Sequence, residues 1–239
     1  MLLEHITMEE FRAGLSVTYS MILPFGSVEE HGLHLPLGTD TIHVYELARL
    51  CAQKRPVFVA PPVWYGLCRS TKQHPGTAGI GSKCLSMFTM EICKSFYHQG
   101  LRNFVLISGH AGGTHMASIL DAADSLTEEL EEARFAVLSV LDLVAQLPSG
   151  IVETAGDAHA GEVETSLMKH LRPQSVKGTS PREFPNFPRF IIARNKLKFW
   201  PGGVWGDPSR ASAEKGKRII EEEAKLLAKL LEELENFKD

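Results

Sequence analysis

The sequence has few cysteines, and their spacing excludes the sites that paired cysteines build. Its 239 residues contain four, and no two of them form a C-x-x-C pair. A chain of this length has no need of disulfide staples, so we expect all four thiols to be reduced. The cysteines are Cys51, Cys68, Cys84 and Cys93.

Basic blocks and long apolar runs are also lacking. The chain has 25 basic and 29 acidic side chains, a formal net charge of −4, and no stretch as basic as a nucleic-acid footprint. No run approaches the roughly 18 apolar residues of a membrane span, and Met1–His5 lacks the basic and apolar parts of a secretory signal. We therefore expect a soluble cytoplasmic protein with neither nucleic acid nor membrane as a partner.

Short apolar runs alternate with amphipathic stretches along the chain. A hydrophobic content of 44% is enough for a sizeable core, and one domain over residues 1–239 is the favoured count. The patterns predict strands at 19–25, 57–60, 103–108 and 135–141, and helices at 41–53, 82–99, 116–131 and 211–237. This alternation is typical of an α/β protein, with a mostly parallel sheet covered on both faces and ligands bound beyond the carboxyl ends of its strands.

Four side chains with ligand chemistry follow the first predicted strand, within Gly26–Asp40. They are Glu29, His31, His34 and Asp40. Residues two apart in an extended segment point the same way, so Glu29 and His31 can face one centre, and a turn can return Asp40 to it. Carboxylates and imidazoles suit zinc, manganese or ferrous iron. The alternative is a polar loop in which Asp40 caps the next helix.

Two more clusters lie further along the chain. His110 directly follows the strand at 103–108, the same topological place as Glu29, and is a candidate ligand from a second strand. The third cluster, residues 157–166, places His159 and Glu162 three apart at the start of a predicted helix, on one face. Two alternatives remain: a phosphate cradle at 109–113, although it lacks P-loop and G-x-G-x-x-G spacing, and an ordinary capped helix start at 157–166.

Together these motifs resemble the creatininase (creatinine amidohydrolase) family, from about residue 20 to about residue 215. The resemblance implies a three-layer α/β/α sandwich, two divalent ions per chain, and hydrolysis of a non-peptide C–N amide bond in a small molecule by a metal-bridging hydroxide. It also implies a homo-oligomer, commonly a hexamer built from dimers. The motifs are Gly26–Asp40, His74–Thr77, Ser108–His110, His159–Ser166 and Gly203–Pro208.

The resemblance also implies roles for particular residues. Glu29 and His110 match ligands of one ion, His31 matches a ligand of the other, and Asp40 matches the carboxylate that bridges them. His159 matches a histidine that moves protons, and we expect it to protonate the departing nitrogen. His34 matches no ligand, so we expect it to orient its neighbours.

One position departs from the pattern. Creatininase carries a glutamate ligand two residues after the histidine of the second motif, where this chain has Gly112. Glu162 is our candidate for the missing ligand, whereas Glu164 would point to the opposite helix face and serve the structure. This departure argues against creatinine as the substrate. Family members with a glycine-rich second motif include formamidopyrimidine deformylases and peptide-trimming enzymes, and their reactions remain alternatives for this chain.

Two other classes of protein compete with the hydrolase. One is a non-catalytic protein with a structural metal, and the other is a nucleotide-binding module built on the Gly109 loop; the first is disfavoured because the cluster is rich in carboxylates and free of cysteine.

The aromatic segment 173–208 is either a lid or pocket wall, a surface packed against a neighbouring subunit, or an irregular excursion. With the apolar stripe of the C-terminal helix, it predicts self-association.

Overall fold

A four-stranded parallel sheet forms the centre of the structure, a computed structural model that describes residues 1–238. The strand order is β2-β1-β3-β4, with every neighbouring pair parallel. The strands are β1 (Ser20–Phe25), β2 (Phe58–Val59), β3 (Asn103–Ser108) and β4 (Arg134–Ser139). All residues of β1 and β3 are buried, as expected for the middle strands of a sheet covered on both faces. The predicted α/β architecture is confirmed.

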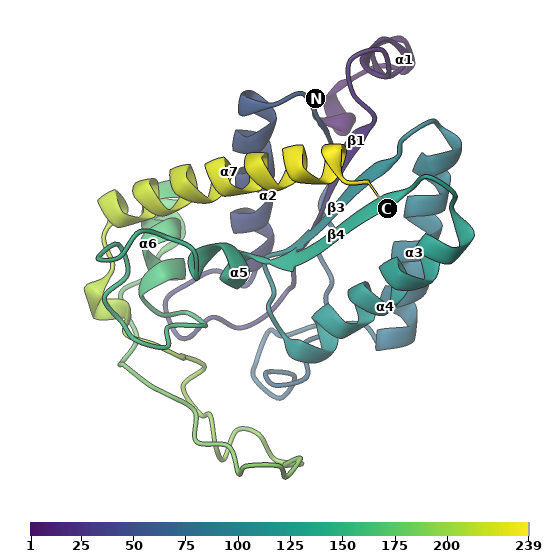
Figure 1. The fold of residues 1–239 in the computed structure, drawn as a ribbon. Coiled ribbons are helices and arrows are strands. Elements are labelled where there is room, and N and C mark those ends of the chain that lie inside the picture. Colours follow the sequence, from purple (N-terminus) through teal and green to yellow (C-terminus); the bar gives the residue numbers. More distant parts are fainter. Residues whose placement is uncertain (239) are drawn as a thin grey trace.

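Helices cover both faces of this sheet (Figure 1). The elements on one face are α2 (Thr39–Lys54), α5 (Val140–Val144), α6 (Glu162–Leu171) and α7 (Ala213–Asn236), and those on the other are α3 (Ser82–His98) and α4 (Gly113–Glu129). A short α1 (Met8–Gly14) with a capping box from Thr7 and Glu10 precedes β1. Single 3₁₀ turns occupy Leu3–His5, Pro173–Ser175 and Pro208–Arg210.

The central strands divide the core into two layers. Ile22 belongs to the cluster beneath α2 and α7, whereas its neighbours Met21 and Leu23 belong to the cluster beneath α3 and α4. This follows from the two-residue period of a strand, which sends successive side chains to opposite faces. The apolar stripe of α7 is buried against the first layer, from Ile220 to Leu234, so it serves the core of this chain.

Some boundaries differ from the predicted ones. α4 begins at Gly113 rather than at residue 116, and β4 ends at Ser139, after which the apolar sequence continues as α5. Ser139 forms a capping box with Asp142, a signal that the apolar run concealed. Between its two 3₁₀ turns, the segment after α6 has no regular structure, and its middle part reaches away from the sheet (Figure 1). No helix within residues 1–238 is long and apolar enough to cross a membrane.

Candidate metal centre

The carboxyl ends of β1 and β3 bring the first two motifs together. Phe25 and Ser108 are register partners at the ends of these strands, and the Gly109 N–H donates to the Phe25 carbonyl at 2.8 Å. A Cβ at Gly109 would overlap the backbone of Asp40. Because glycine has no Cβ, the first turn of α2, which carries Asp40, packs directly against the end of β3.

The first group of donors is built around His110. Its Nδ1 lies 2.7 Å from Glu29 Oε2 and 3.3 Å from Asp40 Oδ2. Its Nε2 donates to the Leu67 carbonyl at 3.3 Å, so Nδ1 is the nitrogen that faces the carboxylates. The other oxygen of Glu29 accepts from the Thr71 hydroxyl. Both carboxylates and the imidazole are buried.

The second group is built around His31. Its Nδ1 donates to the Glu29 carbonyl at 3.1 Å, which turns Nε2 toward Asp40 Oδ1 at 2.9 Å and Glu164 Oε2 at 3.6 Å. The ring of His159 lies beside it, with centroids 4.2 Å apart. Asp40 therefore turns one oxygen to each group, and the Ser27 hydroxyl, 2.5 Å from Oδ2, holds this carboxylate in place.

Glu164, not Glu162, reaches this cluster, and the prediction for the third motif was wrong on that point. His159 lies outside α6, on a segment paired with Trp205, so it shares no helix face with Glu162. As predicted, Glu162 and Glu164 point in different directions, the first toward Lys215 and the second toward His31. The sequence could not show which of those directions faces the metal centre.

Glu162 is engaged elsewhere. Its carboxylate accepts from the backbone N–H groups of Glu153 and Thr154, at 3.0 and 2.7 Å, and from Lys215 Nζ at 2.6 Å. The N-terminus of α6 is capped by a different carboxylate, that of Asp157, which accepts from the Glu162 N–H at 2.7 Å. Glu162 thus ties the loop before α6 to the start of α7.

Opposite charges offset the penalty of burial in the cluster. Burial lowers the pKa of His110, but Glu29 and Asp40 outweigh it and raise that pKa to about 10. For Asp40, burial acts to raise the pKa, but His31 and His110 hold it well below its usual range. The pKa of His31 likewise stands well above its usual range, because Asp40 and Glu164 outweigh burial. The imidazoles thus hold protons against the carboxylates, and a divalent ion at the same donors would replace them.

A cavity of about 310 Å³ opens onto the first group and onto His159, the neighbour of His31. Glu29, His110 and His159 contribute to its wall, with the start of α4. Trp200 and Trp205 form an apolar side of the cavity, so part of the aromatic segment is a pocket wall, one of the roles considered for it. The lining residues are Glu29, Ser70, His110, Ala111, Gly112, Gly113, Leu141, Ala158, His159, Trp200 and Trp205.

His34 is buried, but both of its ring nitrogens are engaged outside the cluster. Nδ1 lies 2.9 Å from the Ser180 hydroxyl and Nε2 lies 2.8 Å from the Thr165 hydroxyl. Burial, followed by the charge of His31, lowers the pKa of His34 to about 4, so the ring is neutral near pH 7. It links the first motif to α6, one turn from the helix start.

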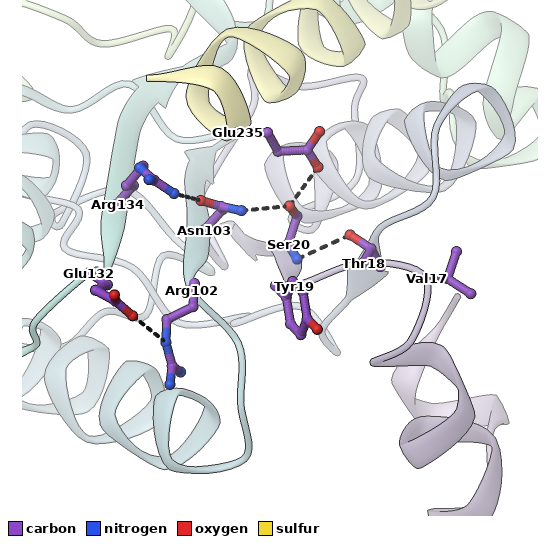
Figure 2. Close-up of a pocket in the computed structure, with 9 residues that line it drawn as sticks. All are labelled: Val17, Thr18, Tyr19, Ser20, Arg102, Asn103, Glu132, Arg134 and Glu235. Carbon is purple, nitrogen blue, oxygen red and sulfur yellow. Dashed lines mark hydrogen bonds and ion pairs between the residues drawn. The ribbon is translucent and has the colours of Figure 1, made fainter. Parts of the chain in front are cut away.

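A second cavity, of about 510 Å³, lies at the amino ends of β1, β3 and β4, and Figure 2 shows the residues that line it. Its polar side chains bond to one another: Asn103 donates to Ser20, and Ser20 donates to Glu235 at 2.6 Å. Arg134 donates to Asn103 in turn, and Arg55 pairs with Glu235. This network fastens the end of α7 to the amino ends of the strands.

Sequence reasoning missed three contributors to the centre. Glu164 was assigned to the structure, and Thr71 and Cys68 lie in a long loop after β2 that has no periodicity. The sulfur of Cys68 nevertheless joins Glu29 and His110 in a group whose donor atoms lie within 4.8 Å of one another. The expectation that the cluster is free of cysteine was therefore wrong.

Comparison with known proteins supports the family and the fold. A family model described as creatinine amidohydrolase matches residues 4–231, and the chain therefore belongs to the creatininase family, a family of hydrolases.

Two relatives and one solved structure illustrate the relationship. The mycofactocin precursor peptide peptidase of Mycolicibacterium smegmatis is 31% identical over 223 residues, which cover 87% of this chain and 82% of that protein. The creatinine amidohydrolase of Pseudomonas putida is 26% identical over 239 residues, with 90% of each chain covered. A creatininase variant described as the zinc–zinc type superposes with a TM-score of 0.87 at 23% identity, over 98% of both chains.

Proposed function

We propose that this protein hydrolyses an amide bond with the help of two divalent ions. Asp40 carries the proposal, because its two oxygens face two separate donor groups, 2.9 Å from His31 Nε2 and 3.3 Å from His110 Nδ1. In this proposal Glu29 and His110 would hold one ion, His31 and Glu164 would hold the other, and Asp40 would be a ligand of each. The chemistry that two ions would supply at these residues is activation of water near neutral pH and polarisation of the amide carbonyl.

The donor set suits zinc, manganese or ferrous iron. With Glu164, the second position has three protein ligands, the usual number for a catalytic zinc. Gly112 supplies none, and a Cβ there would lie 2.5 Å from His110 Nε2. The absence of a side chain at Gly112 thus allows the His110 ring to take the orientation that points Nδ1 at the carboxylates.

We assign His159 the role of a proton donor to the departing nitrogen. Its Nε2 donates to the Glu30 carbonyl at 2.8 Å, and its ring meets Trp200 edge to face at 5.2 Å, so the imidazole is held in one orientation at the cavity wall. Burial and the charge of His31 lower the pKa of His159, but Glu30, Glu29 and Glu164 outweigh them and raise it. A protonated imidazole beside the reacting bond can act as the general acid.

The cavity favours a small substrate. Its volume of about 310 Å³ lies at the lower end of the range for small-molecule pockets, and its walls combine the two indoles with Leu141. We therefore propose a small-molecule amide with a non-peptide C–N bond, such as a cyclic amide or a formamide. Trimming of a peptide end is the second candidate, supported by the peptidase relative at 31% identity.

Two measurements on the purified protein test the proposed metal dependence and the proposed substrate class. Elemental analysis of the purified protein should find close to two divalent ions per chain, and a screen of cyclic amides, formamides and short peptides should find metal-dependent formation of a new amine and a new carboxylate. Two bound ions with turnover only of peptides would select the second candidate. Protein that binds no divalent ion, or hydrolyses amides equally well after chelation, would contradict the proposed chemistry.

A further inference from the structure

Cys68 sits differently from the other buried cysteines of the chain. Cys51 belongs to the core layer beneath α2 and α7, and Cys93 belongs to the layer beneath α3 and α4. Cys68 is also buried, with 5% of its surface exposed, yet it belongs to neither hydrophobic cluster. Its thiol lies instead among donor atoms of Glu29 and His110.

The loop that carries Cys68 is hydrogen-bonded to residues of the candidate metal centre on both sides of this cysteine. Just before it, the Leu67 carbonyl accepts from His110 Nε2, and the Leu67 N–H donates to His115 Nδ1 at 3.1 Å. Just after it, the Thr71 hydroxyl donates to the Glu29 carboxylate. These contacts fix the position of the sulfur relative to the two ligands that it approaches.

We propose that Cys68 is the third protein ligand, besides the shared Asp40, of the ion that Glu29 and His110 hold. The inference rests on the proposed dinuclear centre and adds a sulfur donor to one of its two positions. The thiol hydrogen leaves as a proton to solvent when the sulfur–metal bond forms. A thiolate beside two carboxylates is unfavourable by itself, and a divalent cation in the same place supplies the compensating charge.

A sulfur ligand makes the two positions chemically unequal. Thiolate sulfur favours zinc over manganese, whereas the second position, with His31, Asp40 and Glu164, offers nitrogen and oxygen alone. The first position is therefore selective for a thiophilic ion such as zinc. The second accepts zinc, manganese or ferrous iron.

Cobalt substitution tests the ligand directly, because cobalt(II) bound to a thiolate gives an intense near-ultraviolet charge-transfer band. Chelated protein is reloaded with cobalt alone, and the bound cobalt is counted by elemental analysis. We expect about two cobalt ions per chain and a strong band in the wild type. Cys68→Ser should lose the band, whereas Cys84→Ser, which removes the exposed cysteine, should keep it.

The outcomes separate this inference from the proposed function. Two bound cobalt ions without the band, or a band that survives in Cys68→Ser, would overturn sulfur ligation and leave the dinuclear centre standing. Failure of the wild type to bind cobalt would overturn both. If Cys68→Ser is unstable, the wild-type spectrum still tests sulfur ligation. Cys51 and Cys93 lie in the apolar core and cannot be the source of a cobalt–thiolate band.

A competition between zinc and manganese measures the selectivity. Wild-type protein equilibrated with limiting zinc and excess manganese should retain about one zinc per chain at the first position. Cys68→Ser should retain less zinc than the wild type at the same excess of manganese, whereas Cys84→Ser should behave as the wild type. Equal zinc retention by wild type and Cys68→Ser would contradict a selective first position.

Discussion

Glu164 Oε2 lies 3.6 Å from His31 Nε2, and its other close contact is the Ala160 backbone N–H. The neighbouring acid of the same motif, Glu162, is instead bound to Lys215 and to two backbone N–H groups. Two glutamates two residues apart thus provide a matched pair of variants with opposite expected effects.

The first prediction uses this pair. Glu164→Gln should lose about one of two bound ions, because a neutral amide is a much weaker ligand for a divalent cation than a carboxylate. Glu162→Gln should keep both ions but lower the free energy of unfolding by about 1–3 kcal/mol, since its buried carboxylate bonds are weakened. Elemental analysis and urea denaturation measure the two effects. Loss of metal from Glu162→Gln with normal metal in Glu164→Gln would reverse the assignment.

The second prediction concerns the bridging carboxylate. Asp40→Ala should lose both ions, because each donor group depends on one oxygen of this side chain. Ser27→Ala is the milder companion: it removes the hydroxyl that bonds Asp40 Oδ2 and leaves every proposed ligand in place. We expect weaker metal binding there without complete loss. Normal metal content in Asp40→Ala would rule out a shared carboxylate.

The third prediction separates proton transfer from ligation. His159→Ala should retain about two ions and lose roughly 10²–10⁴-fold in turnover, the usual contribution of a general acid. The loss should be largest for substrates with poor leaving groups and smallest for activated anilides, whose nitrogen departs with little help. An equal loss on both kinds of substrate, or a loss of metal, would argue against the assigned role.

Much of the fold could be predicted because it depends on local pattern. The buried run of β3 was predicted at 103–108, where it is observed, and the strand period assigns its side chains to two layers. Two-residue spacing and a turn predict that Glu29, His31 and Asp40 face one centre, and His110 joins them in the prediction because it follows a second strand at the same end of the sheet. The structure brings these four residues together. Their roles as metal ligands stay a prediction.

The rest depends on tertiary contacts that carry no local signal. Glu162 and Glu164 can be told apart only once α6 is packed against α2 and α7, and that packing sets which face meets His31. Cys68 lies in an irregular loop, where neither period nor spacing reveals which thiol turns inward. The short α5 was missed because Val140 and Leu141 extend an apolar run that continues the strand pattern.

The fourth prediction is self-association through the aromatic segment. The stripe of α7 is buried within this chain, which removes it as a reason to associate, but Phe190 and Ile192 are 92% and 94% exposed on the protruding segment. Burying such side chains is worth about 1.5–3 kcal/mol each. Light scattering at micromolar concentration should show a multimer, and Phe190→Ser with Ile192→Ser should shift it toward the monomer. A monomeric wild type would refute the prediction.

The fifth prediction concerns pH and the buried pair His43 and Glu223, whose Nε2 and Oε2 lie 2.8 Å apart and join α2 to α7. Burial lowers the pKa of His43, but Glu223, with Glu164 and Asp40, outweighs it and raises that pKa above the ordinary value of about 6.5. A raised folded-state pKa means that the pair stabilises the protein fully below about pH 6.5 and loses that contribution as pH rises through the folded pKa.

Chelated protein provides the test, because bound ions would change the field from Asp40 and Glu164. Glu223→Gln should lower the free energy of unfolding at pH 6 by about 3 kcal/mol, as it leaves a buried imidazolium unpaired. A double variant, His43→Leu with Glu223→Leu, should restore much of that loss, since apolar groups of similar size need no partner. The free energy of unfolding of the wild type minus that of the double variant, measured by urea denaturation, should decrease from pH 6 to pH 9. A difference that grows over this interval would contradict a charged imidazole, because a neutral His43 in the folded protein would bind fewer protons than the unfolded chain and give the opposite slope.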